Sequence, residues 1–599
     1  MEMITEKIKE SVIKALKGVE IDFDESQIVV EQTKSLDKGD YTTNIAMRLA
    51  SELKLNPREL AENIVNNIAE SSEIANIEVA EPGFINFYLS DKYLLIQIEK
   101  ILSNGAKEYV KSNIKKDKNI LIEYTDANPF KVLHIGHLYT NSVGEAFSRL
   151  QETTGANVKR ANYQGDIGLH VAKTMWGIKK LLKENNQTFE YIEKLELSKR
   201  VQFLGEAYMT GSEYYDDIED KEAIEEMQDI NYFLSQSVYP SIPKKEFKQY
   251  ANVNMSDWYR KGKMWCLNQF EEIYDTLGTE FDYYFFESEV GEIGYRMVKE
   301  NVGGIFKEDQ GAVIYQGDPN KGLHTRVFIN QFGLPTYEAK EIGLAKAKSE
   351  KGNWNESITI TDKSQSPYFK VVLDALSRLD PMIASMIVHI SHGVVALPGM
   401  KKMSSRKGEV VSAEQLLEIT QEAVKSSMKK NERGFTEEEM DTISKKISVS
   451  AIKYAFLRVG VGKNIAFDIN KDIKFEGGTG PYLMYVYTRA RSIIDSADIA
   501  ISELTPISGP LSNPHVKRLV RHISRVDGIV LSSSINYSPS TLCTYLFELG
   551  QIFNQFYQEV NVLNSNEEDR KLLLAVVEAT AKCMETGLYL LGIDTVSRM

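Results

Sequence analysis

The stretch from Asn119 to Asn162 constrains the fold of this chain more than any other part of its 599 residues. Asn119–Tyr124 is a short apolar segment typical of a strand, and an amphipathic helix is expected from about Gly136 to a stop at Gly155. Val158–Asn162 follows as a second strand. A strand, a helix and a second strand in this order form a βαβ unit, which predicts the start of a parallel sheet of the nucleotide-binding type.

The start of that helix carries two histidines. Asn128 to His137 reads Asn-Pro-Phe-Lys-Val-Leu-His-Ile-Gly-His, so His134 and His137 share one face of the first turn. Unpaired backbone N–H groups and the positive end of the helix dipole lie there, and Gly136 lets a base or a phosphate approach the backbone. The pattern therefore suits ATP. The alternative is that the histidines only cap the helix or pack, which is the better interpretation of an isolated pair.

A basic loop far downstream forms the second motif. Met400 to Gly408 reads Met-Lys-Lys-Met-Ser-Ser-Arg-Lys-Gly, which taken alone would be a solvated loop. Ammonium groups held beside a departing pyrophosphate would stabilise the charge that develops on it in the transition state. The loop and the histidines are therefore compatible with one reaction.

Together the two motifs resemble the HIGH and KMSKS signatures of the class I aminoacyl-tRNA synthetases. The second signature is matched by Lys402, Met403 and Ser404. Ser405 stands where its second lysine is usual and Arg406 where its last serine is, and Lys131 or Lys407 would supply the missing cation. The arginyl-tRNA synthetases resemble the chain in both respects, with a degenerate loop and a lysine just ahead of the first motif.

The resemblance to the arginyl-tRNA synthetases extends over nearly the whole chain. The segments that carry it are Gly39-Asp-Tyr-Thr-Thr-Asn, Pro82-Gly-Phe-Ile-Asn-Phe, Ala161-Asn-Tyr-Gln-Gly-Asp-Ile-Gly-Leu-His, Gly478-Thr-Gly-Pro-Tyr-Leu-Met-Tyr-Val-Tyr, Phe553-Asn-Gln-Phe-Tyr and Leu590-Leu-Gly-Ile. The resemblance implies an enzyme that activates L-arginine with ATP to arginyl-adenylate and transfers it to the 3′ end of tRNA(Arg), with activation that depends on tRNA.

The implied fold class is α/β, with a class I Rossmann-type catalytic domain, a helical insertion, an N-terminal α/β additional domain and a C-terminal all-α anticodon-binding bundle. The expected boundaries are 1–110 for the additional domain, which would contact the tRNA elbow, 111–410 for the catalytic domain with its insertion at about 170–282, 411–470 for a connecting helical stem, and 471–599 for the bundle. The residues themselves predict one helical stretch from Asn44 to Ile68 and strands at Ile28–Glu31, Ile77–Ala80, Phe84–Leu89, Ala312–Tyr315, Val327–Ile329 and Ile358–Thr361.

Site residues follow from the same resemblance. The catalytic set is His134, His137, Lys131, Lys402 and Arg406, and the ATP-binding set is Gly136, Gly165, Asp166, Gly168, His170, Met403 and Ser404. A guanidinium asks for carboxylates and amide oxygens that receive its planar fork. The arginine-binding set is Glu123, Asn128, Glu287, Tyr337, Glu341 and Gln365. The family usually has Arg-Asp where this chain has Lys340-Glu341, so the carboxylate there reaches one methylene further.

The predicted tRNA-binding residues are less specific. Lys517, Arg521 and Arg525 recur at helical spacing as a basic stripe, and tyrosines interleave with arginines around Arg489, which suits stacking on unpaired bases and phosphate contact. The set is Asn86, Phe87, Tyr482, Tyr487, Arg489, Lys517, Arg521 and Arg525. The alternatives are that the tyrosines pack between helices and that the stripe is solvated.

Composition narrows the class of protein further. Three widely separated cysteines, Cys266, Cys543 and Cys583, give no zinc cluster and no disulfide framework and are interpreted as buried small hydrophobes. A net charge of −14 argues against non-specific coating of nucleic acid but leaves room for a local basic face. No apolar run approaches the roughly 20 residues that a bilayer requires. A cytoplasmic monomer with no metal site of its own is expected, with Mg²⁺ bound only together with ATP.

Other classes of protein remain to be weighed against this interpretation. A cysteinyl-tRNA synthetase would need a zinc site, and a glutamyl enzyme would want basic residues where Glu287 and Glu341 stand. A catalytically silent, tRNA-binding paralogue is disfavoured by the intact His134, His137 and Lys402. A small-molecule adenylyltransferase would share the first motif but would leave the N-terminal module and the long helical region after Val410 unexplained.

Overall fold

The computed structural model describes residues 4–19, 21–33, 36–251, 254–397, 411–429, 434–497, 499–507 and 509–599. Contacts divide the chain into two compact units. The sheet unit comprises residues 114–474 and 591–593, and the helical unit comprises residues 1–113, 475–590 and 594–599. The N-terminal module and the C-terminal helices, which the sequence predicts as separate domains, thus belong to one compact unit.

A five-stranded parallel sheet forms the centre of the sheet unit, in the order β12-β11-β5-β6-β7. The strands are β5 (Asn119–Glu123), β6 (Asn157–Gln164), β7 (Tyr283–Phe286), β11 (Glu356–Asp362) and β12 (Ile387–His392). The chain adds strands on one side of β5 first and on the other side later, so the strand order reverses between β5 and β11. In open α/β sheets ligands bind outside the carboxyl ends of the strands at such a reversal. The predicted Rossmann-type fold class is confirmed.

The βαβ unit lies where the sequence predicts it, because α6 (Ile135–Glu152) connects β5 to β6. The predicted strands at 312–315 and 327–329 are also present, as β9 (Ala312–Tyr315) and β10 (Arg326–Ile329), and they form a separate antiparallel sheet of order β10-β9-β8 with β8 at Lys307–Asp309. Their short connections allow antiparallel pairing, whereas a parallel neighbour needs a crossover of a dozen or more residues.

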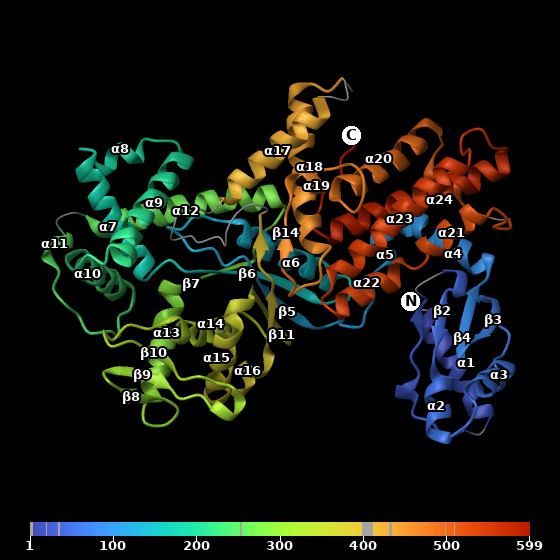
Figure 1. Ribbon diagram of the computed structural model, residues 1–599, viewed down its shortest axis with the longest axis horizontal. Coiled ribbons are helices and arrows are strands. Elements are labelled where there is room, and N and C mark those ends of the chain that lie inside the picture. Colours follow the sequence, from blue (N-terminus) through green and yellow to red (C-terminus); the bar gives the residue numbers. More distant parts are fainter. Residues whose placement is uncertain are drawn as a thin grey trace. The chain divides into compact units, whose positions relative to one another are not determined.

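Helices complete the sheet unit (Figure 1). Those of the insertion between β6 and β7 are α7 (Leu169–Glu184), α8 (Phe189–Glu193), α9 (Leu197–Ser212), the π-helix Glu213–Asp217, α10 (Lys221–Val238), α11 (Lys248–Ala251) and α12 (Met255–Leu277). Those that follow are α13 (Glu287–Glu300), α14 (Tyr337–Lys351), α15 (Ser366–Leu379), α16 (Pro381–Met386), α17 (Ala413–Lys429), α18 (Glu437–Leu457) and α19 (Ile469–Asp472), and the short strands β13 (Val395–Ala396) and β14 (Ile465–Ala466) pair with each other.

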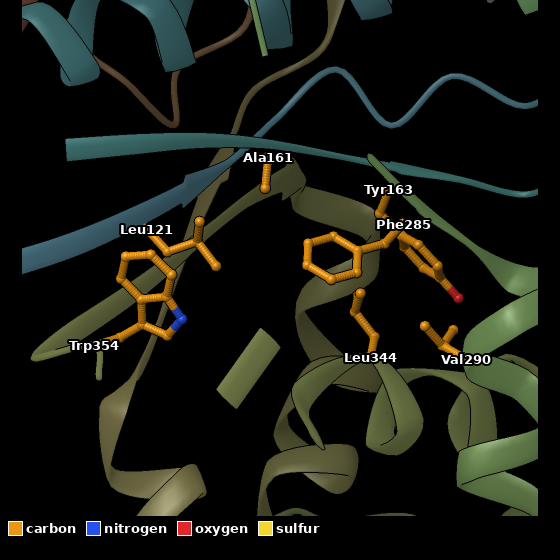
Figure 2. Packing of buried hydrophobic residues seen from close by; sticks show 7 residues of the cluster. All are labelled: Leu121, Ala161, Tyr163, Phe285, Val290, Leu344 and Trp354. Carbon is orange, nitrogen blue, oxygen red and sulfur yellow. The ribbon is translucent and has the colours of Figure 1, made fainter. Parts of the chain in front are cut away.

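The hydrophobic core beneath the sheet fixes α13 and α14 (Figure 2). Its members are Leu121, Ala161, Tyr163, Phe285, Val290, Leu344 and Trp354. Leu121, on the central strand, is fully buried, as is Leu344 on α14. Burial of a large apolar side chain contributes about 1.5–3 kcal/mol, so α14 is held firmly against the strands whose ends carry the site.

The helical unit begins with an antiparallel sheet of order β1-β2-β4-β3. Its elements are α1 (Ile4–Gly18), β1 (Glu31–Gln32), β2 (Tyr41–Thr43), α2 (Ile45–Leu53), α3 (Pro57–Asn66), β3 (Ile74–Ala80), β4 (Phe84–Leu89), α4 (Asp91–Asn104) and α5 (Ala106–Tyr109). The single helix predicted over 44–68 is therefore wrong. Lys54 takes the left-handed conformation and ends α2, and Asn56 caps α3 ahead of Pro57.

The C-terminal helices pack against this module. They are α20 (Gly480–Ala497), α21 (Pro514–Ile523), α22 (Val526–Ile535), α23 (Pro539–Glu559) and α24 (Glu567–Leu590). α24 contacts α4 and α5, and α21 also contacts α4. The three cysteines are free and buried, as the composition predicts. Among the residues that the structure describes, no helix is long and apolar enough to cross a membrane.

Candidate active site

The predicted histidine pair lies at the start of α6 and forms its cap. The backbone N–H of Gly136 donates to Nδ1 of His134 over 3.1 Å, and the backbone N–H of His134 donates to Nδ1 of His137 over 3.1 Å. The ring centroids are 4.0 Å apart. The histidines thus do cap the helix, as the alternative interpretation of the pair predicts. Capping occupies only Nδ1 of each ring.

Electrostatics leave both rings neutral. Burial, with the Lys131 charge nearby, lowers the pKa of His134 to about 4, and burial together with His134 lowers that of His137 well below its usual value. Because Nδ1 of each ring accepts a backbone N–H, the remaining proton resides on Nε2. Each ring therefore presents an N–H donor of the kind that binds phosphate or ribose oxygens.

The loop that leads from β5 to the histidines adopts an uncommon backbone conformation. Thr125, Asp126 and Phe130 have positive φ values of 81°, 52° and 68°, which are costly for residues other than glycine. Neighbours hold the loop in place, since the side-chain amide of Asn141 donates to Oγ1 of Thr125 and the backbone N–H of Phe130 donates to Sγ of Cys266. Strain of this kind clusters at functional sites.

The carboxyl edge of the sheet brings together the predicted arginine-binding residues. Glu123 ends β5, Glu287 follows β7 as the first residue of α13, and Gln365 follows β11. Tyr337 and Glu341 lie one turn apart at the start of α14, as their spacing predicts. The remaining predicted residue is Asn128, whose amide oxygen would lie 2.0 Å from a Cβ added at Gly165, so this glycine is needed for the close approach.

Two internal lysines pair with the buried carboxylates. Nζ of Lys340 lies 2.6 Å from Oε2 of Glu287, and Nζ of Lys348 lies 2.7 Å from Oε2 of Glu123. Both carboxylates and both ammonium groups are at least nine-tenths buried. Among the described residues, sequence reasoning missed Lys348; the only available signal was its helical spacing of seven from Glu341.

Two further carboxyl groups crowd the same place. Burial, with the charge of Glu123 nearby, raises the pKa of Glu341 to about 8. The same two causes raise the pKa of Asp126 well above its usual value, although the backbone N–H of Tyr163 donates to its Oδ1. Sequence reasoning missed Asp126, which nothing in its local pattern distinguishes. Four carboxyl groups thus face two ammonium groups, and the excess favours a cationic ligand.

Asp166, one of the residues predicted to bind ATP, makes several internal contacts. It is fully buried and receives Nζ of Lys263 at 2.6 Å, together with the backbone N–H and the hydroxyl of Ser288 at 2.9 and 2.6 Å. These donors tie β6 to α12 and to the start of α13. The Asp166 side chain therefore braces the site, and its predicted part in ATP binding stays a prediction.

His170 and Gly168 lie beside this brace. Nε2 of His170 lies 2.8 Å from the carbonyl oxygen of Gly165, and burial lowers the pKa of this histidine well below its usual value. Its neutral ring therefore donates from Nε2 and leaves Nδ1 as a buried acceptor, for which the described residues give no hydrogen-bond partner. Gly168, with φ of 138°, begins α7 there.

The predicted basic loop, with Lys402, Met403, Ser404 and Arg406, lies outside the described residues. The residues that follow this loop are described by the structure from 411 onwards. The backbone N–H of Ala413 donates to the carbonyl oxygen of Leu133 over 2.7 Å, and Ser412 forms an antiparallel bridge with His134. The segment that follows the loop is therefore attached to the histidine motif. Lys131, the other candidate cation, lies 5.8 Å from the ring centre of Tyr208 on α9.

The predicted tRNA residues of the N-terminal module need correction. Phe87 is fully buried, and Asn86 is nearly so and accepts a hydrogen bond from the Thr42 hydroxyl over 2.6 Å. Neither can stack on or bind an RNA base from this position. Both residues belong to strand β4, an inner strand of the sheet of the N-terminal module.

The basic stripe is occupied within the chain. Arg521 pairs with Asp40 at 2.7 Å, and Lys517 pairs with Asp91 at 2.8 Å. Arg525, the third member, donates to the backbone oxygen of Thr33 over 2.8 Å. The stripe therefore binds the N-terminal module of its own unit rather than presenting three open cations.

The tyrosines of α20 differ from one another. Tyr482 is buried and accepts from the amide of Asn554 over 2.9 Å, so the packing alternative holds for it. Tyr487 is half-buried and contacts Glu585. Arg489 lies 4.5 Å from the ring centre of Tyr485 and 5.0 Å from that of Tyr557, which is 44% exposed. This arginine and its two rings form an aromatic and cationic group in which one ring, that of Tyr557, is exposed.

The sheet is parallel and has a strand reversal at its centre. Its carboxyl edge carries a capped histidine pair with N–H donors on Nε2 and an excess of buried carboxyl groups. This architecture is that of a class I aminoacyl-tRNA synthetase. Comparisons with known families specify the amino acid. The model for class I tRNA synthetases (R), catalytic domain, matches residues 97–469; those for the arginyl-tRNA synthetase N-terminal domain and the DALR anticodon-binding domain match residues 3–89 and 483–599. The chain belongs to the class I arginyl-tRNA synthetases, and its reaction is the ATP-dependent ligation of arginine to tRNA.

Similar proteins agree with this membership. The arginine–tRNA ligase of Fusobacterium nucleatum is 28% identical over 564 residues, covering 94% of this chain and 93% of the relative. That of Bacteroides fragilis is 28% identical over 615 residues and covers both chains completely. Arginyl-tRNA synthetase structures from Thermus thermophilus and Plasmodium falciparum share the fold over the full length of both chains, with TM-scores of 0.77 and 0.75 at 21% and 22% identity.

Proposed function

We propose that arginine binds at the carboxyl edge between β5 and β11, where the four carboxyl groups of Glu123, Asp126, Glu287 and Glu341 outnumber the two internal lysines. This excess is the observation that carries the proposal. A buried carboxylate pair receives a guanidinium fork with charge-assisted hydrogen bonds. Asn128 and Glu123 would hold the α-amino end, and Glu287, Tyr337, Glu341 and Gln365 would surround the side chain.

ATP would bind over the start of α6. The neutral rings of His134 and His137 donate from Nε2 to phosphate or ribose oxygens, and the α6 N-terminus adds its positive dipole. Lys131, with Lys402 and Arg406 of the basic loop, would counter the charge on departing pyrophosphate. Gly136 would let the nucleotide approach the backbone, Gly165 would lie beside the nucleotide where it also admits the Asn128 amide, and His170 would line the far side.

Mg²⁺ would enter with ATP and be held by its phosphates. Within the described parts of the chain, no cluster of three His, Cys, Asp or Glu side chains could bind a metal by itself. On the side of tRNA(Arg), Arg489 with Tyr485 and Tyr557 would stack on unpaired bases, with Tyr487 beside them. We further propose that the enzyme acts as a cytoplasmic monomer.

Substitution of Glu341 by glutamine tests the pocket. The change keeps the shape of the side chain but removes the charge that receives the guanidinium, so the KM for arginine should rise by about tenfold or more while the KM for ATP stays the same. Aminoacylation by purified protein measures both constants. Glu350→Gln, at an exposed position on the same helix, is the matched control. Equal effects on both KM values would remove Glu341 from the arginine pocket.

A wider assay tests the substrate. Pyrophosphate exchange and aminoacylation with each amino acid, with and without tRNA, should show turnover with arginine and dependence of exchange on tRNA. Charging of another amino acid would contradict the pocket assignment. Absence of turnover with every amino acid would instead favour a silent tRNA-binding protein.

A further inference from the structure

Lys348 contacts both strands that flank the strand reversal, β5 and β11. Its Nζ is 2.7 Å from Oε2 of Glu123, the last residue of β5, and donates to Oγ1 of Thr359 on β11 over 3.2 Å. Glu123 and Thr359 are direct partners in the parallel ladder. One ammonium group thus bridges β5 and β11 at the position where the strand order reverses.

The backbone of Lys348 is fixed as firmly as its ammonium. The indole N–H of Trp354 donates to the carbonyl oxygen of Lys348 over 2.7 Å. Trp354 itself belongs to the buried cluster with Leu121 and Leu344 shown in Figure 2. The long lysine side chain therefore starts from an immobile point, and little of its remaining freedom is left to be lost when substrate binds.

α14 presents Glu341, Leu344 and Lys348 on one face, because they are spaced by three and four residues. Leu344 packs into the core, and Glu341 and Lys348 lie on either side of it along the helix. The charged and ionisable groups around the pair are Asp126 on the loop after β5, Glu341 on α14 with Tyr368 of α15 beside it, and the Glu287–Lys340 pair of α13 and α14.

We propose that Lys348 is a positioning residue for arginine, whose ammonium fixes the Glu123 carboxylate at the strand reversal and offsets the repulsion among the carboxylates that receive the cationic substrate. This inference rests on the proposed placement of arginine beside Glu123 and Glu341. It deepens that placement, since a pocket built of carboxylates alone would hold protons in place of substrate. Lys348 opposes the raised pKa values of both Asp126 and Glu341.

Lys348→Met removes the ammonium and keeps the length of the side chain. Without it the carboxyl cluster retains a proton to higher pH, and arginine must displace that proton to bind. At pH 7 the KM for arginine should rise by about tenfold or more, with the KM for ATP changed less than twofold. The rise should shrink as the pH approaches 8.5, and Lys348→Arg should restore values close to those of the parent chain.

A purely structural role predicts a different pattern. The KM for arginine would then stay unchanged in Lys348→Met, or both KM values and kcat would change together at every pH, and either result would overturn the inference. Loss of folding in the single variant does not block the test. In the Glu123→Gln background, Lys348→Met should raise the KM for arginine by a much smaller factor than in the parent chain, because the ammonium then has no Glu123 carboxylate to position and opposes only Asp126 and Glu341.

A loss in the Glu123→Gln background as large as in the parent chain would mean that Lys348 acts on arginine without positioning Glu123, and the inference would fail. The two proposals also fail separately. If Glu123→Gln leaves the KM for arginine unchanged, the placement of arginine beside Glu123 is wrong. If Glu123→Gln raises this KM and Lys348→Met does not, only the role of Lys348 is wrong. Circular dichroism and thermal unfolding of each variant monitor folding in parallel.

Discussion

Two groups of ion pairs in this chain have similar residues but differ in whether carboxyl groups remain that no cation of the group neutralises. At the carboxyl edge of the sheet unit, Lys340 and Lys348 neutralise only part of a larger set of carboxyl groups. In the helical unit, Arg521 and Lys517 each meet one carboxylate, those of Asp40 and Asp91. The first group keeps additional carboxyl groups that can ionise when a cationic substrate binds, whereas the second group uses its charges to hold two parts of one unit together.

This difference shows that the spacing of charged residues along a helix does not reveal whether they bind another part of the chain or a ligand. The stripe at 517, 521 and 525 has the spacing of a phosphate-binding face, yet the N-terminal module supplies its partners. The pocket carboxylates, which taken one at a time would be interpreted as surface charges, are buried together because parallel strands deliver their ends to one edge. Removal of single partners distinguishes the two groups.

The largest effect is expected for Arg521→Met. Asp40 is fully buried and accepts the backbone N–H of Leu89 as well as Arg521. Loss of the guanidinium leaves a buried charge without its partner, so the helical unit should lose about 3 kcal/mol of stability. Urea denaturation of the purified protein measures the loss. Arg518→Met, on the same helix and hydrogen-bonded to the exposed Gln555, is the matched control.

A tRNA contact at Arg521 would give another outcome. The stability would then be unchanged and the KM for tRNA would rise instead, and the comparison between the two groups would break. A combined Arg521→Met, Asp40→Leu variant sharpens the test. Replacement of both partners by apolar residues removes the uncompensated charge, so much of the lost stability should return.

The next effect concerns the pH dependence of arginine binding. With a pKa of about 8, Glu341 holds a proton in the empty pocket at neutral pH, and a bound guanidinium favours its release. The KM for arginine should therefore fall as the pH rises from 6 towards 8, by up to about tenfold per pH unit. Steady-state aminoacylation with saturating ATP and tRNA measures it. A flat profile in this range would show that no proton leaves the pocket.

Stability should respond to pH in the opposite direction. A carboxyl group whose pKa is raised on folding binds more protons in the native than in the unfolded chain between its ordinary pKa and the raised value, about 4.5 to 8 for Glu341. Its contribution therefore makes the arginine-free protein less stable as the pH rises through that window. Glu341→Gln should remove this part of the pH dependence.

The sequence predicted the fold class, the βαβ unit and the histidine pair, because strand and helix periods and the motif at their junction are local. It failed where the partner is distant. Strands β7 and β12 complete the sheet without a strong pattern of their own, and Phe87 and Asp166 are buried by elements far away in the chain. Lys348 could not be found either, since only the ladder pairing of Glu123 with Thr359 shows why an ammonium belongs there.

The smallest effect is expected for Lys517→Ala, because the Lys517–Asp91 pair is the most exposed of the ion pairs in the two groups. The Lys517 side chain is 42% exposed and that of Asp91 is 31% exposed, and ion pairs in water contribute about 0–1 kcal/mol. The urea midpoint should therefore barely move. If Lys517 also reaches tRNA through its exposed part, the KM for tRNA should rise and its dependence on salt should weaken by about one phosphate contact. An unchanged salt dependence would assign Lys517, like Arg521, to the internal contact alone.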